Sequence, residues 1–117
     1  MNVKELLINI INSKYNYPIF LQGSLSEDQP YPDSFFTFWN NDTIDGEFYD
    51  NEENVTTWDF DLNFYSSDVA LVNTIFEDLK RPLKEAGFIV DGVGYDLLSD
   101  VDTHTGRGIN ILYQQQK

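Results

Sequence analysis

The 117-residue sequence contains no cysteine, which excludes a disulfide framework, a thiolate metal site and a cysteine nucleophile. It also lacks a long hydrophobic run, since no stretch approaches the roughly 20 apolar residues that a membrane-spanning helix needs. The N-terminus has neither the basic segment nor the apolar run and cleavage site of a secretion signal. We therefore expect a soluble protein that is made in a cytoplasm and does not interact with a membrane.

Basic residues are scarce and unevenly distributed. Seven Lys and Arg stand against 20 Asp and Glu, which gives a net charge of −13. No Lys or Arg occurs between Lys14 and Lys80, although that interval is rich in acidic residues. A phosphate-binding surface needs cations to displace condensed counterions, so we expect no direct, sequence-specific nucleic-acid binding. An acidic surface suits a highly soluble protein, a channel wall that repels DNA, or a protein that imitates DNA.

The strongest structural pattern is a strand followed directly by a helix in residues 55–86. Residues 57–64 alternate between apolar and polar side chains, which is typical of a half-buried strand. The apolar side of that strand carries Trp58, Phe60, Leu62 and Phe64. A Ser-Ser-Asp segment can then cap a helix, and apolar residues recur at spacings of three and four up to Leu83. We expect Pro82 to end or kink this helix near Lys80, because proline has no amide donor, although a last turn can restart at Pro82 and stop at Gly87.

The other segments fit one domain, residues 1–117, built around this strand and helix. The expected elements are an N-terminal helix at residues 2–13, strands within 19–65 with an acidic loop at 40–54, a main helix at 67–86 and C-terminal strands within 88–113. Residues 96–105 are expected to be irregular. This order predicts an α+β fold, sandwich-like, in which two helices pack on one mostly antiparallel sheet of about four to five strands.

The expected strand at residues 35–39 (FFTFW) carries aromatic rings on both sides. Phe36 and Phe38 point to one side, and Phe35 and Trp39 point to the other. One side can join the core, so the other must be covered by a helix or by another subunit. Phe35 and Trp39 are therefore candidate subunit-interface residues.

Arg107 is the only basic residue between Lys84 and Lys117, and a glycine lies on each side of it. Its planar guanidinium can bind a carboxylate through two hydrogen bonds. It can reach the acidic surface of a neighbouring subunit, or it can form a bridge within the chain to one of four aspartates: Asp91, Asp96, Asp100 or Asp102. Arg107 and His104, the single histidine, complete the set of candidate interface residues.

Motifs for catalysis and metal binding are weak. His104 has no serine or cysteine partner in an elbow motif, and the sequence contains neither a Walker loop nor HExxH. Residues 41–52 match a calcium-binding loop only in part, because its first and third positions would be Asn41 and Thr43. Asp100, Asp102 and His104 have alternating spacing, but they would form a metal site with a single histidine. We expect no enzymatic activity, no cofactor and no metal site.

Four segments resemble a family of small structural proteins of tailed bacteriophages. They are YPDSFFTFWNNDT, WDFDLNFYSSD, LKEAGFIVDGVGYDLLSD and THTGRGI, and the likeness extends from Tyr31 to Tyr113. The resemblance implies the tail terminator or head-tail joining (neck) group, whose α/β subunits form a ring that caps the tail tube and joins it to the head. It implies a hexameric ring, partners in the tail tube and the head-tail connector, a place in the virion after synthesis in the host cytoplasm, and no catalytic residues.

A different class of function also fits the acidic composition. A small inhibitor that mimics DNA presents carboxylates in rows, in place of phosphates, to a nucleic-acid-binding protein. Asp59 and Asp61 alternate along the expected central strand and are a short row of this kind. Self-association into rings favours the phage structural role, whereas a tight complex with a nuclease and no self-association favours mimicry.

Overall fold

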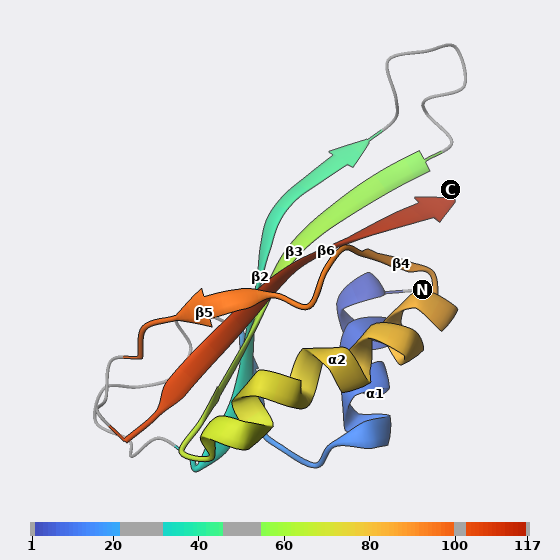
Figure 1. Ribbon diagram of the computed structural model, residues 1–117. Coiled ribbons are helices and arrows are strands. Elements are labelled where there is room, and N and C mark those ends of the chain that lie inside the picture. The colour runs from blue at the N-terminus through green and yellow to red at the C-terminus, as the bar shows by residue number, and fades with distance from the viewer. Residues whose placement is uncertain (1, 22–31, 46–54, 100–102, 117) are drawn as a thin grey trace.

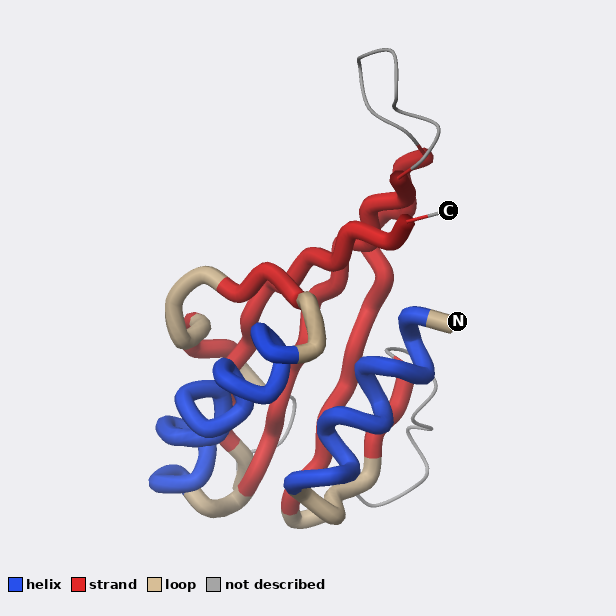
Figure 2. Tube along the Cα trace, turned by 90° about the vertical axis from the view of Figure 1, so that its right-hand side faces the viewer, coloured by secondary structure: helices blue, strands red, loops and turns tan. Residues whose placement is uncertain are grey.

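The computed structural model describes residues 2–21, 32–45, 55–99 and 103–116. In these residues two helices cover one face of a six-stranded β-sheet (Figure 1). The elements are, in chain order, α1 (Val3–Lys14), β1 (Ile19–Leu21), β2 (Ser34–Asp45), β3 (Val55–Ser66), α2 (Val69–Glu85), β4 (Phe88–Val90), β5 (Tyr95–Leu97) and β6 (Thr105–Gln116). Figure 2 shows that both helices lie on the same side of the sheet. Neither of these helices is long and apolar enough to cross a membrane.

The sheet is organised around β3. The strand order is β1-β2-β3-β6-β4, and β5 also pairs with β6. β1 runs parallel to β2, and the other strand pairs are antiparallel. This arrangement confirms the predicted α+β fold, with two helices packed on a mostly antiparallel sheet.

The predicted start of the acidic loop is wrong. The acidic loop was expected to begin at residue 40, but β2 continues to Asp45 and pairs with β3 through a bulge between Asn40 and Asp42. Pairing with a well-formed neighbouring strand here outweighs the low strand propensity of the Asn and Asp residues. The rest of that predicted loop, residues 46–54, lies outside the described residues.

β5 is the strand that the sequence did not reveal. Two of its three residues, Asp96 and Leu97, lie in the segment expected to be irregular, and the strand pairs with Gly106, Arg107 and Gly108 of β6. A Cβ atom on Gly108 would lie 3.0 Å from Cδ1 of Leu97 and 3.1 Å from Cε2 of Tyr95. The glycines of β6 therefore leave the space that the side chains of β5 occupy. The sequence of β5 alone does not show that this space exists.

Both helices begin at side-chain caps, and the cap of α2 is Asp68 rather than a serine hydroxyl of the Ser-Ser-Asp segment. The Oδ1 atom of Asn2 accepts hydrogen bonds from the amides of Lys4 and Glu5, at 2.9 and 3.4 Å. The Oδ1 atom of Asp68 accepts one from the amide of Leu71, at 3.3 Å. These contacts satisfy amides that have no partner within the first helical turn.

α2 does not end near Lys80, because the helix continues through Pro82 to Glu85. Leu83 lies beyond the proline and is only 1% exposed. Burying a leucine contributes about 2 kcal/mol, which offsets most of the ~3 kcal/mol that a proline costs inside a helix. The helix then ends before Gly87, whose positive φ of 107° suits glycine.

The core lies between the helices and the inner side of the sheet. Alternate residues of the three long strands point toward the helices, and their side chains are almost fully buried: Phe36, Phe38, Phe60, Leu62, Phe64, Ile109 and Ile111. The helices contribute the buried residues Val3, Leu7, Ile11, Val72, Ile75, Phe76, Leu79 and Leu83. The alternation predicted for the central strand is thereby confirmed for Phe60, Leu62 and Phe64.

The two helices are also joined by a polar contact at the edge of the core. The hydroxyl of Tyr15, which directly follows α1, donates a hydrogen bond to Oδ2 of Asp78 on α2, at 3.1 Å. Burial raises the pKa of Tyr15 to about 12, and the hydrogen bond to Asp78 acts in the same direction. Tyr15 therefore remains a neutral donor in the folded protein well above neutral pH.

This contact predicts a loss of stability at alkaline pH. Unfolded Tyr15 releases its proton near pH 10, whereas folded Tyr15 holds it until about pH 12. Between these values the folded state binds more protons than the unfolded state, so the stabilisation present below about pH 10 declines as pH rises. We expect the difference in unfolding free energy between the wild type and Tyr15→Phe to shrink from about pH 9 to about pH 12. If the difference in unfolding free energy between the two proteins does not change with pH, the raised pKa of Tyr15 is contradicted.

Candidate functional site

The candidate site is the side of the sheet that faces away from both helices (Figures 1 and 2). We call this side the open face, because none of the described helices covers it. Strand alternation and pairing register place the following residues on it: Phe20, Phe35, Thr37, Trp39, Asp59, Asp61, Asn63, Tyr65, Tyr95, Leu97, Asn110 and Leu112. These residues come from β1, β2, β3, β5 and β6.

One end of the open face is a closed aromatic cluster around Phe35. Phe35 stacks on Tyr65, with ring centroids 5.4 Å apart, and Phe20 meets it edge-on at 6.1 Å. The imidazole of His104 lies at 6.1 Å from the same ring. Phe35 thus points away from the core as predicted, but its own chain covers it, and it is only 2% exposed.

His104 is buried as well, and both ring nitrogens have partners. The carbonyl oxygen of Pro32 can only accept, so Nε2 donates to it, at 2.7 Å. Nδ1 is then the acceptor for the hydroxyl of Thr103, at 2.9 Å. In the single chain His104 therefore ties the start of β6 to the segment before β2.

Trp39 and Tyr95 are the two exposed rings of the open face. Each is 47% exposed. Trp39 lies on β2, to one side of β3, and Tyr95 lies on β5, which pairs with β6 to the other side of β3. Trp39 pairs in register with Asp61. Burial raises the pKa of Tyr95, and the negative charge of Asp61 raises it further, which places Tyr95 near the same carboxylate.

Asp59 and Asp61 form a fixed acidic row between these rings. The side-chain amide of Asn110 donates to Oδ1 of Asp59 at 2.6 Å and to Oδ1 of Asp61 at 3.1 Å. The amide of Asn41 approaches Asp59 from the other side, at 3.4 Å. None of the Lys and Arg residues in the described part of the chain lies on this face, so its charge is uniformly negative.

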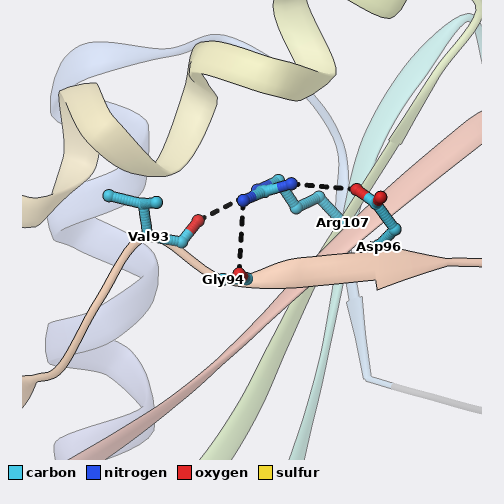
Figure 3. Close-up of polar contacts among 4 residues, drawn as sticks. All are labelled: Val93, Gly94, Asp96 and Arg107. Atoms are coloured by element: carbon cyan, nitrogen blue, oxygen red, sulfur yellow. Dashed lines mark hydrogen bonds and ion pairs between the residues drawn. The ribbon is translucent and has the colours of Figure 1, made fainter.

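Arg107 lies on the helix side of the sheet, in register with Phe64 (Figure 3). Its guanidinium donates to the carbonyl oxygens of Val93 and Gly94, at 3.0 and 3.2 Å, and to Oδ1 of Asp96, at 2.9 Å. Of the two interpretations that the sequence left open, the bridge within the chain is therefore present. Its partner is Asp96, and the arginine side chain is 18% exposed.

Sequence reasoning placed Trp39 on the open face but missed Tyr95 and Asn110. The alternation of Tyr95 and Leu97 opposite Gly106 and Gly108 was the available signal for β5. Asn110 gave no signal, because its role depends on the register between β3 and β6.

The described residues hold no group of three or more His, Cys, Asp or Glu side chains that could bind a metal ion. Of the possible ligands in the C-terminal segment, Asp100 and Asp102 lie outside the described residues, as do residues 46–52 of the possible calcium loop.

No protein-family model matches the sequence, and no curated protein matches it significantly. Its function is therefore inferred from the geometry and chemistry of the open face, together with the sequence resemblance.

The contacts of Arg107 predict a structural role that an exposed arginine does not share. Arg107→Ala should lower the free energy of unfolding by about 1–3 kcal/mol, because two carbonyls and one carboxylate lose a charged donor. Arg81→Ala is the matched control, since its ion pair with Glu85 is exposed and should change stability by less than ~0.5 kcal/mol. Urea unfolding of the two variants measures both values, and equal effects would contradict the structural role.

Proposed function

We propose that this chain is a non-enzymatic structural subunit of a tailed-phage virion, similar to a tail terminator. In this proposal several copies, expected to be six, form a ring at the end of the tail tube and join it to the head. The observation that carries the proposal is the open face, where Trp39 and Tyr95 are each 47% exposed, although the core on the other side of the sheet is filled.

The exposed rings favour a protein partner. Tyr and Trp are enriched at the centres of protein interfaces, where they bury a large area and lose little conformational entropy. The helix side of the sheet is already covered by α1 and α2. A contact between copies is therefore best supported on the opposite side, at Trp39 and Tyr95.

The acidic composition favours the same role. Phage DNA must pass from the head into the tail without binding to the ring, and a surface of like charge prevents phosphate contacts. A net charge of −13 in 117 residues supplies that repulsion. The sequence resemblance from Tyr31 to Tyr113 points to the tail terminator or neck group, and a ring of such subunits accounts for both properties.

The alternative proposal is a small acidic inhibitor that mimics DNA. The specific observation in its favour is the pair of carboxylates of Asp59 and Asp61, which Asn110 holds side by side. Two fixed charges make a short row, and the exposed rings on both sides of it are not needed to imitate phosphates. The structural subunit accounts for both features.

The proposal predicts that Trp39 is needed for assembly and not for folding. Trp39→Ser should weaken self-association at least about tenfold while leaving the thermal unfolding curve nearly unchanged, because the ring is half exposed in the single chain. Val69→Ser is the matched control, since this side chain on α2 is 55% exposed. Sedimentation gives the assembly state, and negative-stain images with and without tail tubes show rings or caps.

A wild-type protein that stays monomeric, fails to cap tail tubes and instead binds a nuclease tightly would contradict the ring subunit and support mimicry. Equal assembly of the wild type and Trp39→Ser would place the contact between copies elsewhere.

A further inference from the structure

Charge is divided between the two sides of the molecule. On the open face the described charged residues are acidic, chiefly Asp59 and Asp61. Five of the Lys and Arg residues described by the structure lie on the helices instead: Lys4, Lys14, Lys80, Arg81 and Lys84. Arg107 is the other described cation, and it is already bound within its own chain.

The densest group of cations is at the end of α2. Lys80, Arg81 and Lys84 lie within five residues, and Glu85 is the one acidic residue in the segment from 80 to 85. Leu79 and Leu83 of the same turns point into the core, so the cations extend from the outer side of the helix. The pair of Arg81 with Glu85 is highly exposed, at 88% and 67%, and such pairs exchange partners easily.

This distribution restricts how two identical copies can associate. In a two-fold contact between open faces, two acidic surfaces would meet, and their like charges would repel. A contact between the open face of one copy and the end of α2 of the next brings opposite charges together. Such a head-to-tail contact closes into a ring when the rotation between copies permits it.

We propose that the open face of one copy binds the Lys80–Lys84 segment of α2 of the next copy. The inference rests on the proposed ring and specifies which surfaces meet in it. Asp59 and Asp61 supply carboxylates held in place by Asn110. Trp39 and Tyr95 supply exposed rings on both sides, and aromatic rings attract the guanidinium and ammonium groups of Arg and Lys.

Charge reversal on each surface tests this contact. Asp61→Lys on the open face and the pair Arg81→Glu with Lys84→Glu on α2 should each weaken self-association at least about tenfold, measured by sedimentation at moderate salt. All these side chains are at least partly exposed, so we expect each variant to unfold at nearly the same temperature as the wild type. A near-native unfolding curve shows that the variant is folded. Glu5→Lys on α1 is the control for Asp61→Lys, because it makes the same change of charge and belongs to neither surface.

Recovery of assembly is the decisive result. A chain that carries all three reversals again places opposite charges in contact, and it should associate within about threefold of the wild type. An equal mixture of the two kinds of variant should also recover, since alternating copies restore every contact in a ring with an even number of subunits.

Normal assembly of the folded single-surface variants, or no recovery in the combined chain, would overturn the contact and leave the proposed ring intact. Failure of the wild type to associate, alone or on tail tubes, would overturn both the ring and the contact.

Discussion

The pairing of β3 along its whole length with both β2 and β6 is the constraint on which the rest of the structure depends. It places Phe60, Leu62 and Phe64 on the helix side of the sheet, where all three are fully buried. Because side chains alternate, the same pairing turns Asp59 and Asp61 to the opposite side. A slip of one residue would exchange the two sides, so core and open face are specified together.

The two sides of the sheet have different energetic roles. The helix side gains its stability from apolar burial. At the edge of that side, Arg107 holds the connection between β4 and β5 in place through its hydrogen bonds to Val93 and Asp96. The open face has buried Phe35 and His104 at one end, but it leaves Trp39 and Tyr95 beside the acidic row. Burying those rings against a second surface with complementary charge would complete the structure, and this is the physical basis of the proposed ring.

The sequence alone predicted the features that depend on local periodicity. The alternation of residues 57–64, the helix of α2 and the opposite directions of Phe36 and Phe35 were all recognisable in it. The extension of β2 to Asp45, the strand β5 and the bridge by Asn110 were not, because each depends on a paired strand distant in sequence. Burial of Leu83 on the core likewise carried α2 through Pro82 against the local preference.

The most direct test of the account is the solvent exposure of Trp39 during self-association. Trp58→Phe leaves Trp39 as the only tryptophan, and acrylamide quenching of its fluorescence can be followed as protein concentration rises. The account predicts that quenching falls and the emission shifts to shorter wavelength as copies associate, because the half-exposed ring becomes buried. Assembly with unchanged quenching of Trp39 would contradict the open face as the contact between copies.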